Sequence, residues 1–164
     1  MSEIRIGFAR ESARSIIRRR GIRTPPIDVH AIAQDEKLDL RIIMSWPDRV
    51  SGLLLRNARL IGLNGKHARR RQRFSLAHEL GHWFMRHDFA WREVDVTIDQ
   101  PPEPPTQFDT ANEGEADEFA GELLAPLFLL KEAFKRNSDV KALADVFDLS
   151  EQAMWVRLLR HRLI

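Results

Sequence analysis

The spacing of apolar residues predicts helices at the start of the chain and short strands after them. Residues 8–20 place alanine and isoleucine at helical spacing, and Gly21 suits the C-terminal cap of that helix. A second amphipathic helix is predicted over residues 27–36. Apolar runs bounded by turn residues then predict three short strands, at residues 39–44, 51–56 and 59–63. The last two strands are separated by Asn57-Ala58, which favours a tight hairpin turn.

The second half of the chain is predicted to be mainly helical. Its expected helices span residues 73–87, 111–126, 127–136, 140–147 and 151–160. Between the first two, the prolines within residues 100–105 exclude helix and central strand. Residues 90–109 are therefore either an insertion without regular structure or a flap beside a site. The whole pattern predicts an α+β fold in one domain, residues 1–164.

The last two helices, within residues 140–164, resemble a helix-turn-helix. Ser150 suits the N-cap of the second helix, and the expected packing positions of the pair are Ala144, Leu149 and Val156. Such pairs bind DNA in some proteins and are ordinary helical hairpins in others. The residues alone leave both interpretations open.

Composition narrows the class of protein. The chain has 164 residues, 43% of them hydrophobic, and no cysteine, which excludes disulfides, thiol nucleophiles and cysteine-based metal sites. No apolar run is long enough to span a bilayer, and residues 1–10 lack the apolar core of a secretory signal, so we expect a cytoplasmic protein with no membrane partner. The net charge is only +2, although arginines cluster at residues 18–20, 69–71 and 157–162. Such clusters can bind nucleic acid, but solvated arginines on helices are commoner, so we do not expect direct nucleic-acid binding.

The most specific chemical signal is His78-Glu79-Leu80-Gly81-His82, within the helix predicted over residues 73–87. Histidines four positions apart lie on one helical face and can hold one metal ion together. Glu79 can reach a water molecule on that ion without binding the metal itself. The alternative is a surface helix with two chance histidines. Gly81 favours the metal site, because glycine is costly within a helix and indicates a close approach of another backbone.

A third ligand is expected on the helix predicted over residues 111–126. Glu113 lies at the edge of its apolar face, and Asp117 lies one turn further on, where it can accept the free N–H of a metal-bound histidine. The alternative is an acidic, solvated first turn, because carboxylates favour helix N-termini. That alternative fits Glu113 less well than the other glutamates of this helix, Glu115, Glu118 and Glu122.

Two motifs resemble those of a known family. The run from Arg71 to His82 is similar to the signature of the ImmA/IrrE family of metallo-endopeptidases. The run from Glu113 to Pro126 resembles that family's second motif, E-x-x-A-N-x-F-A-x-x-L-L-x-P, although Asp117 stands where asparagine is usual. The spacing Asn-Glu-x-x-x-Asp also resembles the third-ligand helix of thermolysin-type zinc peptidases, which favours Glu113 as the ligand.

The resemblance implies a zincin-like peptidase with a small three-stranded sheet, a metal helix, a third-ligand helix and a C-terminal helical pair. It implies Zn²⁺ held by His78, His82 and Glu113, with Glu79 as the catalytic base. It also implies a protein substrate, a helix-turn-helix repressor or antitoxin, whose cleavage relieves repression of transcription. A similar helical tail accompanies the peptidase in that family, which favours the hairpin interpretation of residues 140–164.

Two other functions remain open. The chain could be a catalytically silent partner that binds a repressor or antitoxin, or a DNA-binding regulator. The donor that would stabilise an oxyanion also stays open, because the chain has no tyrosine; the candidates are His67, His161, an arginine or a backbone N–H. His87 is a candidate fourth ligand, although a helix C-terminus favours histidine in any case. Residues 59–63 are a candidate sheet edge with which a substrate peptide could pair.

Overall fold

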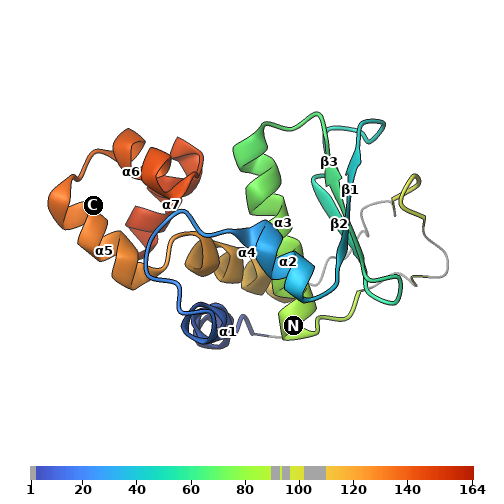
Figure 1. The fold of residues 1–164 in the computed structure, drawn as a ribbon, viewed down its shortest axis with the longest axis horizontal. Helices are drawn as coiled ribbons and strands as arrows, with labels where there is room; N and C mark the ends of the chain where they lie inside the picture. Colours follow the sequence, from blue (N-terminus) through green and yellow to red (C-terminus); the bar gives the residue numbers. More distant parts are fainter. Residues whose placement is uncertain (1–2, 90–92, 94–96, 102–109) are drawn as a thin grey trace.

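The computed structural model describes residues 3–89, 93, 97–101 and 110–164. Within them, helices and strands follow one another along the chain as α1 (Ile6–Arg19), α2 (Val29–Asp35), β1 (Asp39–Ile43), β2 (Gly52–Leu55), β3 (Leu60–Asn64), α3 (Arg69–Met85), α4 (Thr110–Leu124), α5 (Leu127–Arg136), α6 (Val140–Phe147) and α7 (Glu151–Arg160) (Figure 1). The predicted α+β fold is confirmed. None of these helices combines the length and the apolarity that crossing a bilayer demands.

The three strands form one sheet in the order β1-β3-β2. The central strand β3 runs parallel to β1 and antiparallel to β2. The predicted turn at Asn57-Ala58 is present, closed by a hydrogen bond of 3.1 Å from the Arg59 N–H to the Arg56 carbonyl. The expectation that residues 59–63 offer a free sheet edge is wrong, because β3 is paired on both sides. Among the described residues, the edges of this sheet are β1 and β2.

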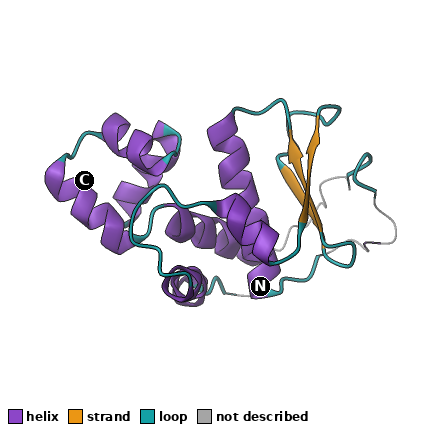
Figure 2. Ribbon diagram, viewed as in Figure 1, coloured by secondary structure: helices purple, strands orange, loops and turns teal. Residues whose placement is uncertain are grey.

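The two faces of the sheet pack against different partners. Leu54 and Ile61 point into the main core, which the helices share. Their neighbours Leu53 and Leu55 point the other way, into a small cluster with Trp46. The indole N–H of that buried tryptophan donates to the Ile98 carbonyl at 2.7 Å. The described helices all lie on the side of the sheet that faces the main core, as Figure 2 shows.

Three buried carboxylates attach α1 to α4. Glu115, Glu118 and Glu122 are only 1%, 2% and 0% exposed. Each pairs with an arginine of the N-terminal segment, in the order Arg5, Arg10 and Arg14. The expectation that these glutamates are solvated is wrong, because their spacing places them on the one face of α4 that α1 covers.

The arginine clusters are partly internal as well. Arg69 and Arg70 of α3 pair with Asp148, which lies between α6 and α7. Arg157 of α7 is 4% exposed and pairs with Glu122. The expectation of solvated arginines is therefore wrong for Arg157, whereas the Arg69 side chain is 69% exposed although it is paired. These ion pairs join the C-terminal helices to α3 and α4.

The C-terminal pair α6–α7 is present with its expected cap. The Ser150 side chain accepts from the Ala153 N–H at 3.1 Å. Ala144 and Leu149 are buried as predicted, but Val156 is 46% exposed, so that packing position was wrong. The buried stripe of α7 passes through Met154, Leu158 and Arg157 instead. The interpretations of residues 90–109 fall mostly on residues outside the described ranges.

Candidate metal centre

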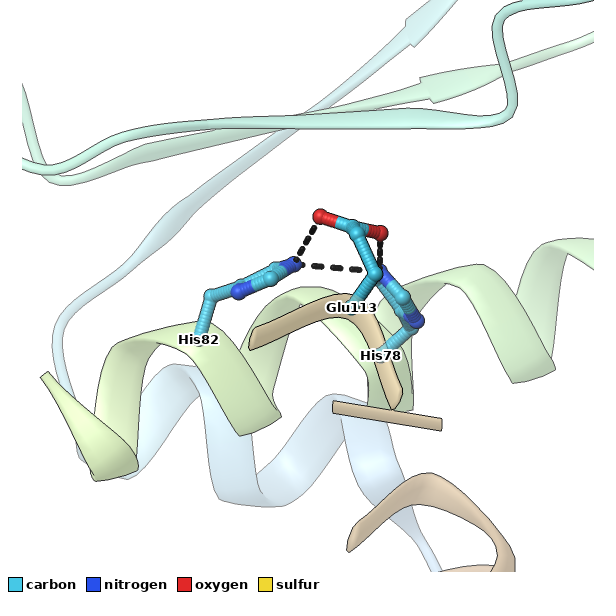
Figure 3. Close-up of side chains that lie close together, drawn as sticks. All are labelled: His78, His82 and Glu113. Carbon is cyan, nitrogen blue, oxygen red and sulfur yellow. Dashed lines mark hydrogen bonds and ion pairs between the residues drawn. The ribbon is translucent and has the colours of Figure 1, made fainter. Parts of the chain in front are cut away.

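His78 and His82 lie one turn apart on α3, and Glu113 reaches them from the start of α4 (Figure 3). The two histidine Nε2 atoms are 3.1 Å apart. The Glu113 carboxylate lies 3.0 Å from Nε2 of His78 and 3.1 Å from Nε2 of His82. All three potential ligand atoms lie within 4.8 Å of one another. The structure therefore brings together the three side chains that the two motifs single out.

A close helix crossing sets this geometry. A Cβ added at Gly81 would lie 3.1 Å from the Ala116 Cα and 3.1 Å from the Phe119 ring. The backbones of α3 and α4 can approach this closely because position 81 has no side chain. The close approach expected from Gly81 is present, and it places Glu113, one turn before Ala116, against the histidines.

The donor set fits a small divalent cation. Two tetrahedral zinc ligands at about 2.05 Å from the metal would be about 3.3 Å apart, close to the distances seen here. The site also favours positive charge. Burial would lower the pKa of His78, but hydrogen bonds to Asp117 and Glu113 outweigh it and raise that pKa to about 10. Burial would raise the pKa of Glu113, and hydrogen bonds from His78 and His82 instead hold it well below its usual range.

Asp117 occupies the outer position expected for it. Its Oδ1 lies 2.8 Å from Nδ1 of His78. A carboxylate only accepts hydrogen bonds, so Nδ1 of His78 carries a hydrogen, which leaves Nε2 as the nitrogen that would bind a metal ion. The Asp117 side chain is 52% exposed, so water also reaches this contact.

Glu79 is buried and lies outside the ligand cluster. It is 7% exposed, and its carboxylate faces β2, where a Cβ added at Gly52 would lie 2.9 Å from its Oε1. Burial raises the pKa of Glu79, while the nearby His82 and His78 oppose that rise. A buried carboxylate next to the three converging atoms suits a group that exchanges protons.

His87 and Glu115 contact each other beside His82, which the sequence analysis did not predict for either residue. Nδ1 of His87 lies 2.9 Å from Nδ1 of His82, and Nε2 of His87 lies 2.8 Å from the Glu115 carboxylate. Both ring nitrogens are therefore engaged away from the cluster, which excludes His87 as a fourth ligand in this arrangement. This contact depends on how α3 ends. Arg86 has a positive φ of 55° and reverses the direction of the chain, which brings His87 against His82.

The pKa values of His87 and Glu115 are shifted by their surroundings. Burial lowers the pKa of His87, and the Arg5 side chain lowers that of Glu115 to about 2.

Of the candidate oxyanion donors, His67 bonds the Asp48 carbonyl at 3.0 Å. His161 lies near Arg157 and Arg10. Neither belongs to the ligand cluster found among the described residues.

Comparison with known proteins gives the family. Residues 33–159 match the model of the IrrE N-terminal-like domain. A solved structure described as a Mycobacterium tuberculosis transcriptional regulator superposes with a TM-score of 0.67 at 18% identity, a likeness that shows the fold alone. The match covers 92% of this chain and 46% of that one, so the chain spans less than half the regulator's length. Curated protein sequences give no match. Because the family match covers more than half of the chain, the protein belongs to the ImmA/IrrE family of metallopeptidase-like domains.

Proposed function

We propose that the protein is a zinc-dependent endopeptidase with a zincin-like domain that comprises residues 1–164. The observation that carries the proposal is the convergence of two imidazole nitrogens and one carboxylate beside a buried glutamate that is not part of the cluster. Two histidines and one carboxylate are a zinc donor set of catalytic rather than structural sites, since they leave a position open. The proposed setting is the cytoplasm.

In this proposal His78, His82 and Glu113 hold Zn²⁺, which when bound supplies the Lewis acidity that lowers the pKa of water from 15.7 to about 7. Glu79 takes a proton from the attacking water and passes it to the leaving amine. Its burial beside Gly52 limits the access of bulk water to the carboxylate. Asp117 keeps the ring of His78 in the tautomer that presents Nε2.

The substrate peptide is proposed to pair with β2 rather than with β3. In the described residues β2 pairs with β3 on one side only, and it passes over the three side chains of the site (Figure 3). Gly52 at its start lies against Glu79. A peptide added along this edge would pass the catalytic base, and main-chain hydrogen bonds would supply part of its affinity.

The proposed substrate is a helix-turn-helix repressor or antitoxin, whose cleavage would relieve repression. The family resemblance supports this class, and the similar solved structure is itself described as a transcriptional regulator. A DNA-binding role for this chain has less support, because each of its three arginine clusters contains arginines that pair with acidic side chains of the same chain. A catalytically silent binding partner differs from the peptidase only in what Glu79 does.

Co-expression with a candidate repressor tests the proposal. Glu79→Gln keeps the shape and the metal ligands but cannot accept a proton, and loss of a general base typically lowers a rate by about 10²–10⁴-fold. We expect a discrete fragment, identified by mass spectrometry, with the wild type and with the control Glu132→Gln, whose side chain is exposed on α5. Glu79→Gln should give none. A stable complex with both proteins and cleavage by neither would favour the silent partner, and equal cleavage by both would exclude Glu79 as the base.

A further inference from the structure

Behind His82, a chain of buried polar groups runs from the metal site to the N-terminal segment. His82 contacts His87, His87 contacts Glu115, and Glu115 contacts Arg5, all at 2.8–2.9 Å. The two histidines and the glutamate are 2%, 4% and 1% exposed. Water has little access to these groups, so each must find its hydrogen-bond partner within the protein.

Arg5 determines which atom donates and which accepts in each hydrogen bond of this series of polar groups. Arg5 donates to Glu115 through its backbone N–H, Nε and Nη2, each at 2.9 Å. A carboxylate held by such donors accepts only, so Nε2 of His87 must donate to it. In a neutral imidazole the other nitrogen then accepts, so Nδ1 of His87 receives the hydrogen from Nδ1 of His82. This leaves Nε2 of His82, where His78 and Glu113 converge, as the nitrogen that would bind the metal.

We propose that His87 and Glu115 are positioning residues that hold His82 in its metal-binding tautomer and orientation. The proposal rests on the metal site of the proposed function. It assigns the two ligand histidines different supports. His78 is hydrogen-bonded to Asp117, whose side chain is 52% exposed, so that water can replace it as the hydrogen-bond acceptor. His82 is hydrogen-bonded to the buried imidazole of His87. The Phe89 ring also covers His82, with 5.2 Å between the two ring centroids.

Zinc affinity of the purified protein tests the proposal without any substrate. His87→Leu removes the acceptor for His82, whereas the amide of His87→Gln can accept from His82 and donate to Glu115. We expect His87→Leu to bind zinc about 10–100-fold more weakly than the wild type in competition with a chromophoric chelator. His87→Gln should recover most of that loss. The visible spectrum of the Co²⁺-loaded protein, which reports ligand geometry, should change in His87→Leu and much less in His87→Gln.

Glu118→Gln is the matched control for Glu115→Gln. Glu118 lies one turn further along the same face of α4, is equally buried, and pairs with Arg10 and Arg160. Both substitutions disturb a buried ion pair, but only Glu115 contacts His87. We expect Glu115→Gln to weaken zinc binding and to alter the Co²⁺ spectrum. Glu118→Gln should lower only the thermal stability of the zinc-free protein.

Each failure has its own signature. Wild type without zinc affinity would remove the metal site and this inference with it. Wild type with zinc and an unchanged affinity in His87→Leu would overturn the positioning role while leaving the metal site intact. Equal losses of zinc affinity in Glu115→Gln and Glu118→Gln would also overturn it, because they would show a general effect of the ion pairs on the fold. Circular dichroism of each variant establishes that the protein compared is folded.

Discussion

Gly52 of β2 faces Glu79 of α3 so closely that a Cβ at position 52 would lie 2.9 Å from the Glu79 Oε1. That oxygen is at the free end of a flexible side chain, so it can move aside while the backbone stays in place. Gly52→Ala should therefore fold and bind zinc like the wild type but displace the proposed base. We expect cleavage of the substrate to fall by about 10²-fold, the usual result of a displacement near 1 Å.

Gly7→Ala is the control, because a Cβ there would meet no atom within 4 Å. It should leave cleavage unchanged. If Gly52→Ala cleaved like the wild type, Glu79 would not act from the position described here.

The metal content is the second expected outcome. Protein purified without chelator should carry about one Zn²⁺ per chain, because two imidazoles and one carboxylate converge in the cluster. His78→Ala and His82→Ala should each empty the site, whereas His30→Ala, an exposed position on α2, should not. Elemental analysis measures all four proteins. Full zinc occupancy in both site variants would exclude this cluster as the metal site.

The third outcome separates a ligand from its neighbour. Glu113→Gln removes the carboxylate that both histidines contact, whereas Asp117→Asn alters a partly exposed group that contacts His78 alone. Asp117→Asn should weaken zinc binding by at most the about 10–100-fold typical of outer partners, and Glu113→Gln by more. Titration with a competing chelator gives both affinities. A larger loss of zinc affinity in Asp117→Asn than in Glu113→Gln would show that Glu113 is wrongly assigned as the third ligand.

Acid should destabilise the zinc-free protein partly through His161. Burial, helped by Arg157 and Arg10, lowers the pKa of His161 from 6.5 to about 4. As the pH falls through this window, the unfolded chain takes up a proton at His161 while the folded chain does not, so the free energy of unfolding falls. Melting temperatures between pH 7 and pH 4.5 should drop less steeply in His161→Gln than in the wild type.

His30→Gln supplies the reference slope, because His30 is an exposed residue of α2. Parallel slopes for the wild type and His161→Gln would show that this partly buried imidazole does not contribute to acid sensitivity.

The histidine pair and Glu113 could be predicted from the sequence because each motif lies within a single helix. Histidines four positions apart share a face whatever the rest of the chain does. Gly81 predicted the close helix crossing, because a glycine within a helix is favourable only where another backbone comes near. The coarse α+β pattern also follows from local periodicity.

The errors have a common physical cause, which is pairing between distant segments. Glu115 reads as a solvated acid until Arg5, 110 positions earlier in the chain, is placed beside it. The central position of β3 depends on β1 pairing with it in parallel, which no local pattern encodes. The prediction for Val156 was wrong because Arg157, its neighbour, is the residue that faces the end of α4: the Arg157 Nε–H donates to the Ala125 carbonyl.

The three ion pairs between residues 5–14 and α4 also bear on where the folding unit begins. The family match starts at residue 33, beyond the whole of α1. A fragment trimmed to the matched residues, 33–159, would nevertheless lose the Arg5 cation from Glu115, two cations, Arg10 and Arg160, from Glu118, and the Arg14 cation from Glu122. The stretch that sequence comparison recognises is thus shorter than the stretch that can bury its own charges, and an expression boundary should be placed before Arg5.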